Sequence, residues 1–154
     1  MFKNNIISEF LSEKDLEDIS LTIRDIEKNT SGEIRVCLKR KRGYLEKEFS
    51  PREIALKEFT ALNMHQTNDR TGVLFFVLFD ENKFEIIADE GINSKISEDI
   101  WNLFSDEIIK HFRDKKYCAG IKNVLVKIGE YLISEFPANK ENINELPDDV
   151  IIKP

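Results

Sequence analysis

The stretch Asp69–Gly91, DRTGVLFFVLFDENKFEIIADEG, contains the pattern that decides the fold. Its apolar run at residues 73–79 has no polar residue, which is typical of a central strand covered on both faces. Residues 80–82 form an acidic connection of hairpin length. Apolar and polar side chains then alternate over residues 83–88, the period of a strand. This stretch therefore predicts a buried strand and an antiparallel neighbour at the middle of a sheet.

The chain before this stretch predicts two helices and a strand between them. Ser12 with Asp15, and Ser50 with Glu53, have the spacing of capping boxes, in which a serine oxygen accepts from the backbone at the third helical position. Between these helices, Glu33–Arg40 alternates apolar and polar residues, so we expect a half-buried strand at or near the sheet edge. A strand, a helix and a strand in this order predict a right-handed crossover and a small mixed sheet.

Two more amphipathic helices follow the hairpin. The first is expected to begin at Ser94 or Ser97, and the second to run from about Lys116 to Phe136. The whole chain, at 154 residues, has the length of one ordinary domain. We therefore assign residues 1–136 to a single α/β domain, and residues 137–154 to a polar C-terminal tail that packs loosely or is disordered.

Composition excludes several classes of partner. A net charge of −6 argues against nucleic acid or an anionic membrane as the general partner. No apolar run approaches the roughly 18 residues of a membrane span, and the N-terminus lacks a secretory signal pattern, so we expect a cytoplasmic protein without a membrane span. The basic run Lys39–Arg42 could bind an anion, but a solvated loop is the favoured interpretation because no phosphate-binding pattern accompanies it.

Strand direction separates the acidic residues into two groups. Residues 80 and 81 fall at one end of the sheet together with the basic run, and the strand length separates them from the other group by more than about 20 Å. The other end collects the first residue of one strand, a residue before the next, and two residues after the third. These four are Glu33, Asp69, Asp89 and Glu90.

Carboxylates gathered at one point predict a site for a hard cation. With nearby hydroxyls such as Thr30 and Thr71, they are the oxygen ligands that Ca²⁺ or Mg²⁺ requires. Like charges there would repel unless a cation or a positive side chain compensates. The alternative is that they are solvated strand-end residues, or that Asp89 caps the following helix. A rival ligand site lies at the opposite end, near Ser50, but it has no Gly-rich turn for a nucleotide.

Four short motifs give the chain a resemblance to a known family. Each combines a glycine with a turn or a helix start, and their combined order over about residues 11–136 is more specific than any one of them. The sequence resembles the TPM domain, which is found in thylakoid, bacterial and animal membrane-associated proteins. The motifs are Thr30–Ile34 (TSGEI), Asp69–Leu74 (DRTGVL), Asp89–Ile92 (DEGI) and Tyr117–Ile121 (YCAGI).

This resemblance implies a three-layer α/β/α sandwich, with a small mixed sheet flanked by about four helices. It also implies divalent-cation binding by acidic residues near the strand ends and, for some members, an acid phosphatase activity. Carried over by position, the ligand candidates are Glu33, Asp69 and Asp89, with Glu90 adjacent. The sequence departs from the family pattern because Asp89-Glu90-Gly91 stands where many relatives have a more Gly-rich turn, and because it lacks their signal peptide and membrane anchor.

The expected function is that of a Ca²⁺- or Mg²⁺-binding module with a structural or interaction role, whose partner beyond the cation could be another protein. The alternative is a metal-assisted phosphatase acting on phosphate monoesters, in which the ion polarises a phosphoryl oxygen. The sequence shows no obvious nucleophile or arginine clamp for that reaction. A third interpretation is an adaptor that recruits a partner through its acidic tail or exposed helix faces.

Overall fold

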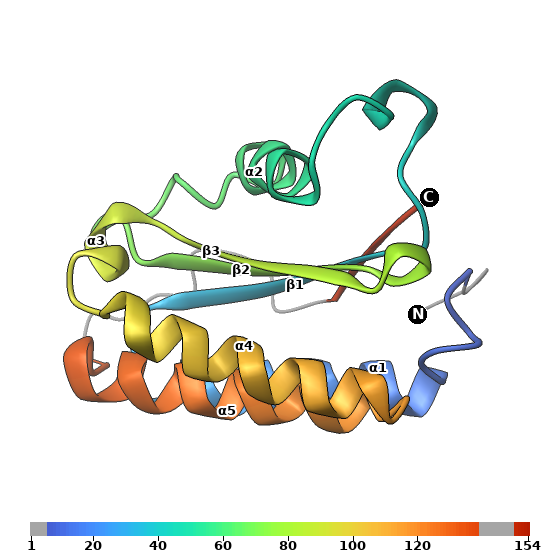
Figure 1. Cartoon of the computed structure of the whole chain (residues 1–154). Coiled ribbons are helices and arrows are strands. Elements are labelled where there is room, and N and C mark those ends of the chain that lie inside the picture. The colour runs from blue at the N-terminus through green and yellow to red at the C-terminus, as the bar shows by residue number, and fades with distance from the viewer. Residues whose placement is uncertain (1–5, 139–149) are drawn as a thin grey trace.

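The computed structural model describes residues 6–138 and 150–154, and its centre is a mixed sheet of four strands in the order β3-β2-β1-β4 (Figure 1). Strand β1 pairs in parallel with both β2 and β4, whereas β3 pairs antiparallel with β2. The sequence-based prediction of a small mixed sheet is confirmed. The strands are β1 Glu33–Lys39, β2 Gly72–Leu78, β3 Lys83–Ala88 and β4 Ile151–Lys153.

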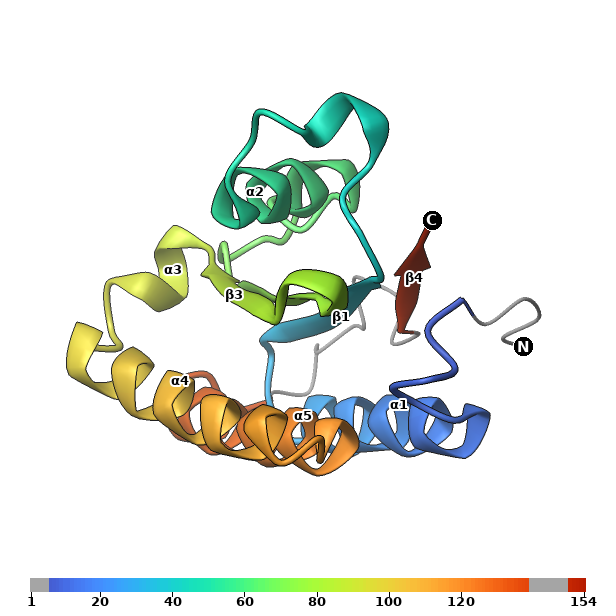
Figure 2. The ribbon, with the colours of Figure 1, turned by 45° about the vertical axis from the view of Figure 1, so that its right-hand side comes forward.

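Helices cover both faces of this sheet and give the expected three layers (Figures 1 and 2). One layer consists of α1 (Glu13–Glu27), α4 (Glu98–Arg113) and α5 (Tyr117–Glu135), and the opposite layer is α2 (Pro51–Ala61). Residues 6–138 hold one α-helix more than expected, because the short α3 (Glu90–Asn93) follows β3 at the end of the sheet. Within the described residues, no helix has the length and apolar character needed to span a bilayer.

The helix starts are where the sequence places them. The Ser12 hydroxyl accepts a hydrogen bond of 3.0 Å from the Asp15 amide at the start of α1. Ser50 accepts one of 3.2 Å from the Glu53 amide at the start of α2. Each bond satisfies a backbone donor that has no partner inside its helix. The other two long helices begin after Ser97 and Lys116, as expected.

Strand β2 is the centre of both cores, as its uninterrupted apolar sequence predicts. All seven of its residues are buried. Val73, Phe75 and Val77 belong to the core beneath α1, α4 and α5, whereas the residues between them pack in the core beneath α2. Because successive strand residues point to opposite faces, a strand with helices on both sides needs apolar residues at every position.

The prediction of a half-buried β1 is wrong, because all seven of its residues are buried. Their burial includes Arg35, which is 6% exposed, and Lys39, which is 5% exposed. Both point to the face covered by α2. The expected position is confirmed, because β1 lies next to the edge strand β4. The Lys39 ammonium is compensated by the Glu46 carboxylate at 2.5 Å, which permits its burial.

The end of the predicted tail is also part of the fold. Val150 is 4% exposed in the main core, and β4 pairs in parallel with residues 37–39 of β1. The expectation of loose packing or disorder is therefore wrong for residues 150–153. The apolar residues 150–152 belong to this added edge of the sheet. A run of three residues is too short for its periodicity to predict a strand. The expectation for residues 139–149 lies outside the described part of the chain.

The basic run after β1 is not a solvated loop, because two of its arginines are ion-paired. The Arg42 guanidinium lies 2.7 Å from Glu81 and donates three further hydrogen bonds to carbonyls of residues 46, 47 and 49. Arg40 pairs with Asp80 at 3.5 Å and with Glu9 at 2.8 Å. The pairs with Asp80 and Glu81 attach the loop after β1 to the connection between β2 and β3. These two acidic residues therefore have a structural role.

The Arg42–Glu81 pair predicts a pH-dependent contribution to stability. The hydrogen bond from Arg42 lowers the pKa of Glu81. A carboxylate with a lowered folded-state pKa stabilises the fold above its unfolded pKa, about 4.3, and this contribution is lost as the pH falls through the folded value. The destabilisation caused by Glu81→Gln should therefore shrink between about pH 5 and pH 3.

Urea denaturation of both proteins across this pH range measures the difference. Glu48→Gln is the matched control, because Glu48 is an exposed glutamate of the same loop and has no ion pair among the described residues. The free energy of unfolding of Glu48→Gln should stay close to that of the wild type at every pH. A loss of stability in Glu81→Gln that does not change with pH would contradict a contribution from the Arg42–Glu81 pair.

Candidate functional site

Four acidic residues gather near one end of the sheet, and we call them the carboxylate rim: Glu33, Asp69, Asp89 and Glu90. Glu33 is paired with Gly72 across β1 and β2. The Asp89 amide donates to the Gly72 carbonyl at 2.9 Å, so Glu33 and Asp89 flank the first residue of β2. The register therefore places Glu33 and Asp89 at one end of the sheet, as strand direction predicted, with Asp69 and Glu90 in the adjoining segments.

A close backbone contact positions the loop before β2 against α3. The Gly91 amide donates to the Arg70 carbonyl at 2.9 Å. A Cβ atom on Gly91 would lie only 2.2 Å from the Asp69 carbonyl oxygen and 2.6 Å from that of Arg70. Glycine is therefore required at position 91 for the loop to approach, and this approach brings residues 69 and 70 beside residues 89 and 90.

The Asp89 carboxylate is buried and fully engaged at this contact. Its side chain is 5% exposed. Oδ2 accepts from Arg70 Nε at 2.7 Å and Oδ1 accepts from Arg70 Nη2 at 2.8 Å, which is the two-point geometry of a strong arginine–carboxylate pair. Oδ1 also accepts from the Glu90 amide at 2.8 Å. Asp89 therefore caps a helix, but this helix is the short α3 and not the one that was expected to begin at Ser94 or Ser97.

Arg70 is the positive side chain that compensates the rim. Its Nη1 lies 3.4 Å from the Glu90 carboxylate, so one guanidinium faces two acidic residues. The hydrogen bond from Arg70 to Asp89 raises the pKa of the arginine, which stays charged. The Arg70 side chain remains 45% exposed. Sequence reasoning required a compensating charge without naming one, although Arg70 directly follows Asp69.

The other three carboxylates differ in environment. Asp69 and Glu90 are exposed, whereas Glu33 is 2% exposed on the face covered by α2. Across residues 6–138 and 150–154, no three side chains of Asp, Glu, His or Cys are close enough to hold a metal ion together. The rim thus offers the oxygen ligands that Ca²⁺ and Mg²⁺ take, but its arrangement with Arg70 in place does not fit either ion.

The two cysteines do not supply a nucleophile. Burial raises the pKa of Cys37 to about 12. Burial likewise raises the pKa of Cys118 to about 11. Both thiols are free, and both stay protonated at neutral pH, where only a thiolate would attack a substrate.

The profile of the TPM domain matches residues 7–131 of the chain. The BA42 protein from the psychrophilic bacterium Bizionia argentinensis has a similar structure, with a TM-score of 0.85 and 35% identity over 96% of this chain and 98% of that one. No curated protein sequence matches.

Two less similar structures share the fold. The N-terminal domain of a protein from P. gingivalis has a TM-score of 0.68 at 17% identity, covering 84% of this chain and 80% of that one. The N-terminal domain of cg2496 from Corynebacterium glutamicum has a TM-score of 0.62 at 10% identity, covering 88% and 82%. At these identities, the likeness extends to the arrangement of helices and strands alone.

Proposed function

Because the chain belongs to the TPM domain family, we propose that it is a divalent-cation-binding module in which Ca²⁺ or Mg²⁺ competes with Arg70 for the carboxylate rim. One observation carries this proposal: the buried Asp89 carboxylate is held at both oxygens by a half-exposed arginine. A buried carboxylate needs a positive partner. Arg70 is that partner in this structure, and a bound cation would be the other.

An ion can replace Arg70 at Asp89 because the two side chains differ in solvent exposure. The arginine side chain is 45% exposed, so its guanidinium can move into water, whereas Asp89 cannot. Once Arg70 leaves, Asp89 and Glu90 would supply carboxylate oxygens from adjacent positions, and the exposed Asp69 lies in the neighbouring loop. Water would complete the six to eight oxygens that Ca²⁺ takes, so we expect weak binding, with Kd of about 10⁻⁴ M.

The exchange would change the surface as well as the site. Ion binding would release the Arg70 guanidinium to solvent near the end of the sheet. The ion would then supply the positive charge beside Asp89. Such a change could alter which proteins the domain contacts, and it needs no rearrangement of the sheet. The proposed role is therefore an interaction module whose rim responds to divalent cations.

Calorimetric calcium titration of three variants tests the proposal. Arg70→Gln removes the competing charge, so calcium should bind about tenfold more tightly than to the wild type. Asp89→Asn removes the buried ligand and should abolish binding at millimolar calcium. Arg40→Gln is the matched control, because Arg40 also pairs with acidic residues but at the opposite end of the sheet, and its affinity should equal that of the wild type.

Two results would overturn competition at the rim. One is an unchanged or weakened calcium affinity in a folded Arg70→Gln protein, with folding checked by circular dichroism. The other is binding that survives Asp89→Asn. Magnesium titrations of the same proteins then show which of the two ions the rim prefers.

The alternative function, metal-assisted hydrolysis of phosphate monoesters, would use the same rim. It can be assayed in these variants with a generic phosphate ester and added Mg²⁺ or Ca²⁺. Turnover that is lost in both Asp89→Asn and Asp69→Asn but kept in Arg40→Gln would support it. Calcium binding without turnover would leave the binding module as the function.

A further inference from the structure

Strand β3 leaves one backbone edge without a neighbouring strand. It is the terminal strand of the described sheet, and its other edge pairs with β2. The bond from the Asp89 amide to the Gly72 carbonyl sets the alternation, so residues 83, 85 and 87 bond toward β2. The N–H and C=O groups of Phe84, Ile86 and Ala88 therefore point outward, and no hydrogen bond in the described part of the chain uses them.

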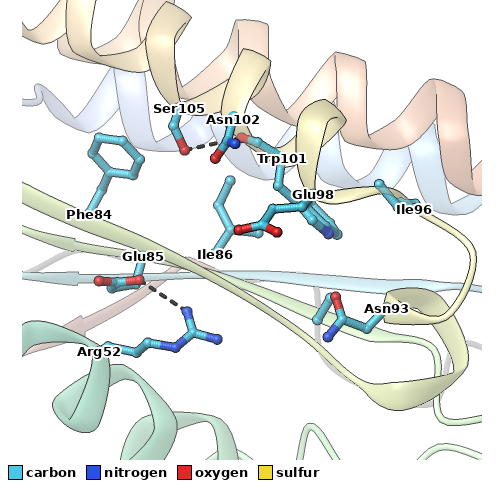
Figure 3. Close-up of a pocket in the computed structure, with 11 residues that line it drawn as sticks. Arg52, Phe84, Glu85, Ile86, Asn93, Ile96, Glu98, Trp101, Asn102 and Ser105 are labelled. Carbon is cyan, nitrogen blue, oxygen red and sulfur yellow. Dashed lines mark hydrogen bonds and ion pairs between the residues drawn. The ribbon is translucent and has the colours of Figure 1, made fainter.

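A groove follows this edge. Its larger cavity, of about 650 Å³, has β3 as its floor, Arg52 of α2 on one side and Trp101, Asn102 and Ser105 of α4 on the other (Figure 3). A second cavity of about 340 Å³ adjoins it at Phe84, which lines both. The groove therefore extends along the whole outward-pointing part of β3.

The two walls of the groove differ in chemistry. On the side of α4, Ile86, Ile96 and Trp101 present apolar surface (Figure 3). On the side of α2, the Arg52 guanidinium pairs with the Glu85 carboxylate at 3.2 Å. A strand added to β3 would point alternate side chains to these two walls, so it would need apolar residues at every second position and polar residues between them.

The two cavities of the groove differ in charge. In the larger one, Arg52 and Glu85 pair with each other, and Glu98 lies on the side of α4 (Figure 3). Arg113 and Lys115 line the smaller one, and Lys83 begins β3 at that end. None of these three cations has an ion pair among the described residues, and all three are exposed. A segment that runs antiparallel to β3 would place its C-terminal end beside this positive group.

We propose that the free edge of β3 binds an extended segment of a partner protein by strand addition, antiparallel to β3, with acidic residues at the C-terminal end of the segment. The main-chain groups of Phe84, Ile86 and Ala88 supply the hydrogen bonds. The positive charges of Arg113 and Lys115 favour a segment whose C-terminal end is acidic and lies beside them. About six to eight residues, at roughly 3.3 Å each, span the groove.

The walls decide between a single segment and a second copy of the chain. Residues of α2 and α4 stand on both sides of the β3 edge. A second copy that offered its own β3 would bring the same two helices against these walls, so the edges could not come within the 4.8 Å or so that strand pairing requires. A single extended segment carries no flanking helices and fits between them.

Selection of displayed random ten-residue peptides on the full chain, followed by synthesis of the tightest binders, provides the probe. We expect these peptides to carry acidic residues in their C-terminal half. Amide hydrogen exchange should show the Phe84, Ile86 and Ala88 amides unprotected in the free protein and protected at least tenfold when a peptide is bound. The Ile87 amide, which points toward β2, should be protected in both states.

Charge reversal tests the orientation. The double variant Arg113→Glu/Lys115→Glu alters only exposed side chains, so the fold should persist. It should weaken binding of the selected peptides at least tenfold, and peptides with lysine in place of the C-terminal acids should recover that loss. Ile133→Glu, on the exposed surface of α5, is a control that should leave binding unchanged.

The proposal is overturned if the selection yields no binder, or if binders leave the exchange of the three outward amides unchanged. It is also overturned if the charge-swapped peptides do not recover binding to the reversed variant. Self-association of the chain that protects the same amides without any peptide would show that a second copy is the occupant instead.

Discussion

Replacement of Gly91 by alanine is expected to lower the free energy of unfolding by about 3 kcal/mol. The added Cβ would lie 2.2 Å from the Asp69 carbonyl oxygen and 2.6 Å from that of Arg70. Both obstacles are backbone atoms, so the loop before β2 has to move away from α3. Helix propensity alone would favour alanine over glycine by about 1 kcal/mol, so the expected sign is opposite to the local preference.

Chemical denaturation followed by circular dichroism measures this loss. Gly43→Ala is the control, because the three nearest neighbours of a Cβ there would all be side-chain atoms of Glu46, the first at 3.0 Å, and not backbone atoms. We expect it to cost about 1 kcal/mol or less. Equal stability of the wild type and Gly91→Ala would show that the loop and α3 are not in contact as described, and that the rim is not fixed by this approach.

Truncation of Phe75 should destabilise the protein by about 4 kcal/mol. Phe75 is fully buried in the middle of β2, beneath α1, α4 and α5, and its ring lies 6.2 Å from that of Phe84. Phe75→Ala removes the burial of most of a ring and leaves a cavity between the sheet and three helices. The surrounding elements are held by other contacts, so the cavity can close only in part.

The matched control for this truncation is Leu103→Ala. Leu103 lies on α4 and is 59% exposed, so its loss should change the free energy of unfolding by about 0.5 kcal/mol or less. The free energies of unfolding of both variants are measured by urea denaturation, with one common dependence on urea concentration. A loss below about 1 kcal/mol for Phe75→Ala would contradict the placement of β2 at the centre of two cores.

Much of this fold could be predicted because its signals are local. The uninterrupted apolar run of β2 follows from its two covered faces, and the capping boxes at Ser12 and Ser50 are contained in four residues each. Strand direction then predicts that Glu33 and Asp89 share one end of the sheet, because parallel and antiparallel neighbours fix where each strand begins or ends.

The parts that could not be predicted depend on partners distant in sequence. Arg35 and Lys39 indicate an exposed side of β1, and their burial becomes clear only once α2 and Glu46 are in place. Strand β4 is three residues long and is formed by pairing with β1, so no local pattern indicates it.

The candidate site shows the same division. Its carboxylates could be assigned to one end of the sheet from strand direction. Whether they surround a common point depends on side-chain direction, and Arg70 reaches Asp89 across 19 positions of sequence. Arg70 has a φ of 55°, a left-handed backbone conformation that is uncommon for a side chain of this kind and is set by the turn before β2.

Competition between a divalent cation and Arg70 for Asp89 is tested most directly by the side-chain Nε–H signal of Arg70 in nitrogen–proton NMR. In the free protein Arg70 Nε donates this proton to Asp89 Oδ2, with 2.7 Å between the nitrogen and the oxygen, so the signal should be shifted and the proton protected from exchange with water. Calcium titration should move it to the position of a solvated arginine, with the same midpoint as calorimetric binding. Calcium binding that leaves the Arg70 signal unchanged, or no binding at millimolar calcium, would contradict the account.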